Sequence, residues 1–143
     1  MYTYKYPRPA LTVDAIVIAR VAGNSYLLLI ERGTEPFKGK WALPGGFVEI
    51  DELLEAACIR ELKEETGFEA GSMQQFKVFD AIGRDPRHRT ISVVFYTFTG
   101  RMVDVKGKDD AANAKWFNIS NLPELAFDHL EIIRLFIQEH LDA

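Results

Sequence analysis

The sequence predicts one domain that combines strands and helices, a fold of the α/β class. Its 143 residues fit a single domain by length. Runs of β-branched and aliphatic residues between turn signals predict strands, and two segments with apolar residues at helical spacing predict helices. Hydrophobic residues make up 48% of the chain and charged residues 27%, which is ordinary for a folded protein. This composition excludes a disordered or collagen-like chain.

The first part of the chain predicts an arm, two paired strands and a loop. Residues 1–10 hold two prolines and three tyrosines, which favours an extended arm because proline removes amide donors. Residues 11–19 and 26–30 are rich in apolar β-formers and are expected to pair through a Gly-Asn-Ser turn. Residues 33–40 have the composition of a loop. At Pro44-Gly45-Gly46 we expect a backbone geometry that glycine adopts most easily.

The second part predicts two helices with strands between them. One helix should begin near Asp51-Glu52, whose charges suit a helix N-terminus, and end at Gly67, a residue suited to a left-handed cap. The last helix is predicted over 127–141 from its amphipathic spacing. The remaining segments are strands at 73–82, 90–98 and 115–117, a charged loop at 83–89 and a hydrophilic loop at 105–113.

Charge and cysteine content exclude several kinds of protein. Seventeen Lys and Arg against 21 Asp and Glu give a net charge of −4, whereas binding to nucleic-acid phosphates requires a basic surface. The only cysteine, Cys58, excludes internal disulfides and thiolate metal clusters and is expected in the core. The start lacks an apolar signal region, and no run approaches about 20 apolar residues. We therefore expect a cytoplasmic protein without nucleic-acid or membrane partners.

Three glutamates of the first helix carry the main chemical signal. Glu61, Glu64 and Glu65 fall within a sector of about 100° on the helix. The apolar residues Leu53, Leu54 and Ala57 occupy much of that sector earlier in the helix. The three glutamates therefore continue a stripe that is expected to face inward.

A divalent cation would offset the cost of this arrangement. Glu61 and Glu65 repel each other four residues apart, and acidic groups in the last turn oppose the helix dipole by roughly 0.3 to 1 kcal/mol. Oxygen-rich carboxylate clusters suit Mg²⁺ or Mn²⁺. The helix geometry alone leaves a second interpretation equally open, a hydrated acidic surface that Arg60 and Lys63 partly neutralise.

The spacing of residues 46–68 separates these interpretations. The segment GFVEIDELLEAACIRELKEETGF places Gly46, five residues, Glu52, seven residues, Arg60-Glu61-Leu62, one residue, Glu64-Glu65, one residue and Gly67-Phe68. This pattern resembles the signature box of the Nudix hydrolases, with every defining position occupied. The strands before the box and the later Trp116-Phe117 pair are also similar to the family, so the resemblance extends over most of the chain.

The resemblance implies a Nudix-type α/β/α sandwich with a mixed β-sheet over residues 1–143, and hydrolysis of a pyrophosphate bond in a nucleoside diphosphate derivative. It implies that Glu61, Glu64 and Glu65 are catalytic metal ligands for Mg²⁺ or Mn²⁺, joined by the carbonyl of Gly46. The positions of Glu52 and Arg60 are those of a structural pair that holds the shape of the box.

The proton acceptor is left open by the sequence. Clustered divalent ions can neutralise charge on a phosphoanhydride and make water nucleophilic, and Glu61 or Glu65 can accept the proton of that water. In the family the base often lies outside the box. The candidates there are Asp109, Asp110 and Glu124.

Looser similarities indicate the branch of the family. The segments PRPALTVDAIV, GRDPRHR and LPELAFDHLEI resemble small ADP-ribose pyrophosphatases, although the glutamate expected near Asn113 is absent. Arg32, Arg84 and Arg87 are the candidates for binding the diphosphate. Further candidates are Arg89 and His88 in the same loop, and Tyr4 and Tyr6, whose rings suit stacking on adenine. His129 and His140 are expected to be structural.

These observations predict Mg²⁺-dependent hydrolysis of ADP-ribose to AMP and ribose 5-phosphate. One alternative is a nucleoside triphosphate pyrophosphohydrolase that removes damaged nucleotides. Another is a noncatalytic nucleotide sensor, although such regulators carry a DNA-binding domain after the Nudix fold and only one predicted helix follows Trp116-Phe117. The family resemblance also implies a homodimer.

Overall fold

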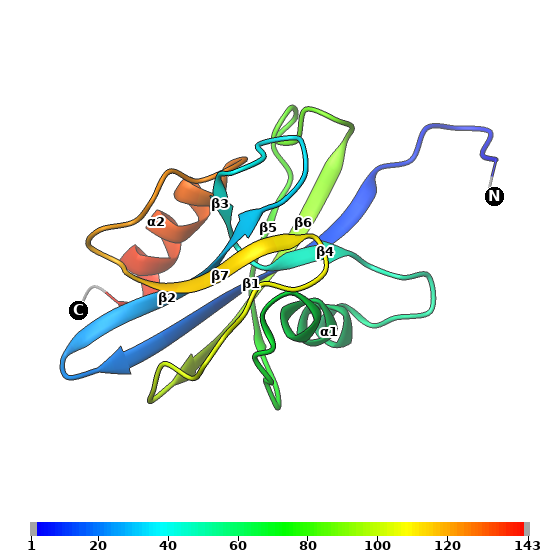
Figure 1. Ribbon diagram of the computed structural model, residues 1–143. Helices are drawn as coiled ribbons and strands as arrows, with labels where there is room; N and C mark the ends of the chain where they lie inside the picture. Colours follow the sequence, from blue (N-terminus) through cyan, green and yellow to red (C-terminus); the bar gives the residue numbers. More distant parts are fainter. Residues whose placement is uncertain (1–2, 142–143) are drawn as a thin grey trace.

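The computed structural model describes residues 3–141. Within that range the chain forms seven strands and two helices, drawn in Figure 1. They are β1 (Ala10–Val21), β2 (Asn24–Arg32), β3 (Trp41–Ala42), β4 (Gly45–Phe47), α1 (Leu54–Thr66), β5 (Gln74–Phe79), β6 (Thr90–Thr99), β7 (Ala111–Asn118) and α2 (His129–His140).

The strands form one mixed sheet in the order β3-β2-β1-β6-β5. In addition, β4 pairs with β1, and β7 pairs with β2. Strands β1 and β6 run parallel over ten residue pairs, and the other pairings are antiparallel. Because β1 is central, its middle residues, 13–19, are all buried. This pairing brings residues about 80 positions apart in the sequence into register.

The two helices cover opposite faces of the sheet, as Figure 1 shows. Alternate residues of β1 point to opposite faces. Val13, Ala15 and Val17 pack with α1 in one core cluster, and Ile16 and Ile18 pack with α2 in another. The predicted α/β/α sandwich with a mixed sheet is therefore confirmed.

Gly45 and Gly46 are required by close contacts rather than by their backbone angles. Both lie in β4, and neither has a positive φ. A Cβ on Gly45 would overlap the carbonyl oxygen of Val13, and a Cβ on Gly46 would lie 2.6 Å from the carboxyl carbon of Glu61. The expected special geometry at Pro44-Gly45-Gly46 was wrong, because the glycines instead let β4 lie close to β1 and to α1.

Several predicted boundaries shift in the structure. Helix α1 begins at Leu54, because the Glu52 carboxylate accepts a hydrogen bond from the Glu49 amide and closes the preceding loop. Its end is as predicted, since Gly67 has φ 81° and caps the helix. Pairing with β2 extends β7 into the predicted hydrophilic loop, and the short strands β3 and β4 were not predicted. Strand β5 ends at Phe79, which leaves Ile82 exposed.

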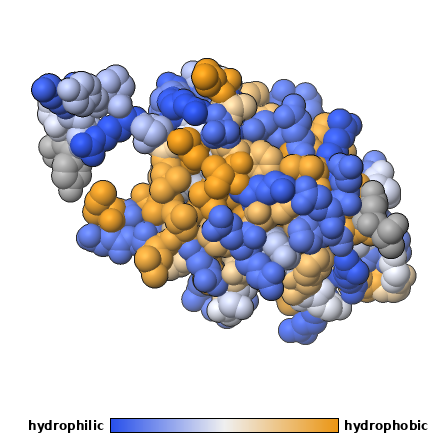
Figure 2. All heavy atoms as spheres, turned by 180° about the vertical axis from the view of Figure 1, so that it is seen from behind, coloured by the Kyte–Doolittle hydropathy of each residue, from blue (hydrophilic) through white to orange (hydrophobic). Residues whose placement is uncertain are grey.

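Neither helix of residues 3–141 has the length and apolar character needed to cross a membrane. Seen from behind in Figure 2, the N-terminal segment stands away from the body, and apolar side chains are exposed on the body beside its base.

Candidate active site

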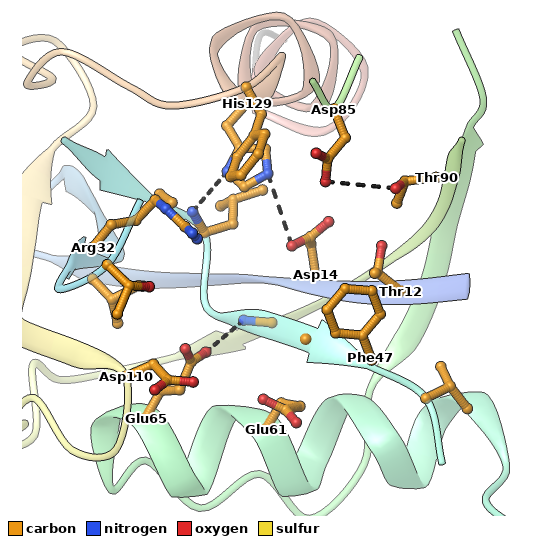
Figure 3. Close-up of a pocket in the computed structure, with 18 of the residues that line it drawn as sticks. Thr12, Asp14, Arg32, Phe47, Glu61, Glu65, Asp85, Thr90, Asp110 and His129 are labelled. Carbon is orange, nitrogen blue, oxygen red and sulfur yellow. Dashed lines mark hydrogen bonds and ion pairs between the residues drawn. The ribbon is translucent and has the colours of Figure 1, made fainter. Parts of the chain in front are cut away.

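A cavity of about 400 Å³ lies where α1, β4 and β1 meet the loop before β6. Figure 3 shows α1 on one side of the β4 backbone, and Asp14, Asp85 and His129 on the other. The predicted site residues that line it are Arg32, Gly46, Arg60, Glu61, Arg84 and Arg87, together with Glu65.

Arg60 binds three glutamates of the box. Its guanidinium donates to Glu52 at 2.5 and 2.9 Å, to Glu61 at 2.7 Å and to Glu64 at 3.1 Å. The hydrogen bond to Glu52 raises the pKa of Arg60 further and holds the pKa of Glu52 below its usual value. A fifth hydrogen bond, to the carbonyl of Phe47, ties α1 to the end of β4. These contacts support the structural role predicted for the Glu52–Arg60 pair.

Glu65 is the most buried carboxylate of the box, at 7% exposure. Its Oε1 accepts a hydrogen bond of 2.7 Å from the Gly45 amide. Burial raises the pKa of Glu65 to about 8, although the Gly45 hydrogen bond opposes that shift. Burial also raises the pKa of Glu61, which is partly offset by Arg60. Both carboxylates are therefore held where water stabilises their charge poorly.

The inward stripe was predicted correctly only in part. Glu65 and Ala57 are buried, but Leu53 is 81% exposed and the Glu64 side chain is 45% exposed. Leu53 precedes the helix in an extended conformation, so the helical spacing used to place it does not apply. Glu64 lies at the edge of the stripe, where Arg60 is its partner.

The donor chemistry of the box suits a hard divalent cation. Glu61, Glu64, Glu65 and the Gly46 carbonyl supply only oxygen atoms, which Mg²⁺ and Mn²⁺ prefer. The absence of a side chain on Gly46 lets the Glu61 carboxylate lie directly against its backbone. Among residues 3–141, however, no three His, Cys, Asp or Glu side chains converge as a preformed metal cage. Arg60 instead balances Glu61 and Glu64.

The buried position of Glu65 predicts a pH dependence of stability in the metal-free protein. Its folded pKa of about 8 exceeds the ordinary value of 4.5, so the folded state keeps a proton that the unfolded state releases between these pH values. The free energy of unfolding should therefore fall as pH rises through this window, by about 1.4 kcal/mol per pKa unit. Glu65→Gln should remove that loss.

Denaturant unfolding in EDTA at pH 6 and pH 8.5 measures this effect. Glu69→Gln is the matched control, because Glu69 is exposed and pairs with Lys63 at 3.0 Å. An equal pH dependence in wild type and Glu65→Gln would contradict the prediction.

The candidate arginines differ in how firmly they are held. Arg84 donates two hydrogen bonds to Asp128, and its side chain is only 5% exposed. Arg87 pairs with Asp85 at 2.7 Å, while Arg32 donates to the Pro36 carbonyl.

Arg32 and Arg87 are coupled to each other. Burial and the nearby Arg87 charge lower the pKa of Arg32. Both guanidiniums also lie over the Phe127 ring, at 5.0 and 5.7 Å from its centroid. An anion between the two arginines would relieve their repulsion.

The remaining candidates differ in whether they line the cavity. Asp110 lines the cavity beside Glu65, whereas Glu124 pairs with Lys40 away from it and Asp109 does not line it. Tyr4 and Tyr6 are exposed on the N-terminal segment.

Four further residues were named from the sequence. Arg89 donates to the Asp80 carbonyl, and His88 contacts Thr90. His140 stacks on Phe136, and Cys58 is buried.

Sequence reasoning missed a polar wall of the cavity. Its residues are Thr12, Asp14, Asp85, Thr90 and His129. His129 was expected to be only structural, yet it lines the cavity while its Nδ1 accepts a hydrogen bond from the Leu43 amide. Burial lowers the pKa of His129. The signal available in the sequence was the pair of polar residues, Thr12 and Asp14, at alternate positions of an otherwise apolar strand.

The fold and the acidic box define a hydrolase of phosphoanhydrides, and comparison with known proteins agrees. The NUDIX domain model matches residues 9–136. The chain therefore belongs to the Nudix family. It is homologous to the ADP-ribose pyrophosphatase of Methanocaldococcus jannaschii, with 43% identity covering 93% of this chain and 76% of that protein.

Two solved structures resemble the whole chain. The NUDIX domain of Shewanella oneidensis NrtR, complexed with ADP ribose, has a TM-score of 0.89 and 29% identity, covering 99% of this chain and 94% of that one. The bifunctional NMN adenylyltransferase/ADP ribose pyrophosphatase of Francisella tularensis, complexed with AMP and a Mn ion, has a TM-score of 0.85 and 35% identity. That match covers 95% of this chain and 43% of the bifunctional protein.

Proposed function

We propose that this protein hydrolyses ADP-ribose with one water to AMP and ribose 5-phosphate, using Mg²⁺. The observation that supports the proposal is the cavity itself, which is lined both by oxygen donors of the Nudix box and by the guanidinium groups of Arg32 and Arg87. The homologous ADP-ribose pyrophosphatase and the neighbours with ADP ribose or AMP support the adenosine diphosphate class of substrate.

The proposed roles follow from charge and position. Glu61, Glu64, Glu65 and the Gly46 carbonyl would hold the cation. When bound, the cation supplies the positive charge that stabilises developing charge on the phosphate oxygens. Without the cation, Arg60 balances the carboxylates, and its five hydrogen bonds keep α1 aligned with β4. Arg60 would therefore keep the carboxylates of the box in position for the cation.

Arg32 and Arg87 would bind the diphosphate. Both line the cavity, and their mutual repulsion is relieved by an anion between them. Arg84 would act indirectly, since Asp128 already binds its guanidinium. Of the three acids considered as bases, Asp110 is the one that lines the cavity, and we propose it as the proton acceptor outside the box.

A substrate panel tests this function. ADP-ribose, NADH, diadenosine polyphosphates and nucleoside triphosphates are offered at comparable concentrations with Mg²⁺, and kcat/KM is compared. We expect ADP-ribose to rank first, as the homologous ADP-ribose pyrophosphatase and the similar domain complexed with ADP ribose support. A triphosphate ranking far above ADP-ribose would make the protein a nucleotide-sanitising hydrolase. Binding of ADP-ribose without turnover of any substrate would make it a sensor.

We further propose a homodimer, supported by exposed apolar side chains near the β4–α1 connection. Leu11, Phe47, Ile50 and Leu53 are 41 to 84% exposed, and the Val48 amide bonds the Leu11 carbonyl, which brings these segments together. Contiguous exposed apolar surface is typical of interaction sites. Light scattering should give twice the chain mass of 16.3 kDa. Ile50→Glu together with Leu53→Glu should yield the monomer, and a wild-type monomer would contradict this proposal.

A further inference from the structure

The two parallel central strands, β1 and β6, carry polar side chains where they reach the cavity. Thr12 and Asp14 lie on the same face of β1 as Ile16, which packs against α2. On β6, Thr90 and Ser92 lie in register with Ala10 and Thr12. A continuous apolar face would pack equally well against neighbouring elements, so four polar side chains here require another explanation.

These polar groups are deeply buried. Asp14, Asp85, Thr90 and His129 are between 3 and 8% exposed, and Ser92 is fully buried. They bind one another in part, since Ser92 donates to Asp14 Oδ2, and Thr90 lies beside Asp85. Burying such groups is costly unless their hydrogen bonds are satisfied. We call Thr12, Asp14, Asp85 and Thr90 the polar floor of the cavity.

The polar floor retains capacity for a ligand. Asp14 Oδ1 is 3.8 Å from His129 Nε2, which is too far for a hydrogen bond. The Thr12 hydroxyl lines the cavity and has no side-chain partner among residues 3–141. Figure 3 shows both groups on one side of the cavity, facing Asp85 and Thr90. A carboxylate oxygen and a hydroxyl are thus both available there.

The charge of the polar floor selects the chemical class of that ligand. Asp85 is paired with Arg87, but the Asp14 carboxylate has no Lys or Arg partner among residues 3–141 and therefore disfavours a phosphate, and none of the four floor residues is aromatic. A group that donates several hydrogen bonds is favoured, and the vicinal hydroxyls of a sugar do so, as carboxylates that bind ribose illustrate. Arg32 and Arg87 line the same cavity and suit the adjoining diphosphate.

We propose that the polar floor binds the terminal ribose of ADP-ribose, with Asp14 and Thr12 bonded to its vicinal hydroxyls. This inference rests on the proposed function. It identifies the contacts by which the protein would distinguish ADP-ribose from ADP, which lacks the terminal ribose. The terminal ribose ends the molecule and fits a floor closed by Ser92 and His129. The adenosine ribose carries a base as well as a phosphate, so it needs space on both sides.

Binding measurements on the metal-free protein test this assignment. Calorimetry in EDTA gives Kd for ADP-ribose and for ADP, which lacks only the terminal ribose. Thr12→Val removes one hydroxyl at nearly constant shape, and Asp14→Asn removes the charge. Each should raise Kd for ADP-ribose about tenfold, the effect of losing one hydrogen bond to a bound group, and change Kd for ADP less than about twofold.

Thr97→Val is the matched control, because Thr97 lies in β6, opposite Val17 and outside the cavity. It should leave both dissociation constants unchanged. Thr12→Val carries the test even if Asp14→Asn destabilises the fold, since Thr12 is only partly buried.

Three outcomes would overturn the inference. Equal weakening of ADP-ribose and ADP would place the adenosine ribose on the polar floor. Unchanged affinity for both ligands would show that the floor does not contact the ligand. If wild-type protein does not bind ADP-ribose in EDTA, the floor is not a binding site, and turnover of ADP-ribose with Mg²⁺ then decides separately whether the proposed function holds.

Discussion

Glu64→Gln should lower kcat for ADP-ribose by at least about a hundredfold, because it removes one of the negatively charged carboxylates that would hold the cation. The fold should be retained. The Glu64 side chain is 45% exposed, and it pairs with Arg60 at 3.1 Å. Exposed ion pairs of this kind contribute about 0 to 1 kcal/mol, so the thermal midpoint should change little.

Glu69→Gln provides the comparison for Glu64→Gln. Glu69 is also an exposed carboxylate, and it pairs with Lys63 at 3.0 Å, but it lies outside the box of residues 46–68. Its kcat should equal that of wild type. Steady-state kinetics with Mg²⁺ and thermal unfolding in EDTA are measured for all three proteins. Unchanged turnover by Glu64→Gln would remove Glu64 from the proposed cation site.

Gly45→Ala should destabilise the protein by about 3 kcal/mol, at the upper end of the cost of overpacking. Its Cβ would overlap the Val13 carbonyl oxygen and lie 2.5 Å from Asp14 Oδ1. Strand β4 would have to move away from β1, which would also weaken the 2.7 Å hydrogen bond from Gly45 to Glu65. Activity should fall with stability, because this bond aligns β4 with the box helix.

Gly71→Ala is the matched control for this substitution. No heavy atom lies within 4 Å of the Cβ position at Gly71, and its φ is not positive. Removing a glycine there should be neutral or slightly stabilising. Denaturant unfolding compares both variants with wild type, and a thermal midpoint drop of about 10 °C is expected for Gly45→Ala. Equal stability of the two variants would show that β4 tolerates the added methyl group.

The spacing of the box was sufficient to predict the local part of the site. The helix that carries Glu61 and Glu65, its end at Gly67 and the pairing of Glu52 with Arg60 all follow from positions within 16 residues of one another. Local sequence determines such contacts because helical geometry fixes which side chains share a face. Even here the position of Leu53 was wrong, since the helix begins one residue later.

The polar wall of the cavity is formed by residues that lie far apart in the sequence. The Leu43 amide and His129 are 86 residues apart in the sequence, and Ser92 and Asp14 are 78 apart. No local pattern indicates that β1 and β6 pair in parallel with this register. The short strand β4 was missed for the same reason, because three residues, two of them glycine, form a strand only beside β1.

The sequence by itself determined the α/β class, the acidic helix and the oxygen donors that it offers to a cation, because these features repeat or recur at short, regular spacing. Only the tertiary structure decided that Arg84 is held by Asp128 while Arg32 faces Arg87, and that Asp110 lies beside Glu65. It also decided that polar residues of β1 and β6 share one cavity wall. The physical reason is that sheet register and the packing of distant segments set these distances, and neither is encoded in any single stretch of the chain.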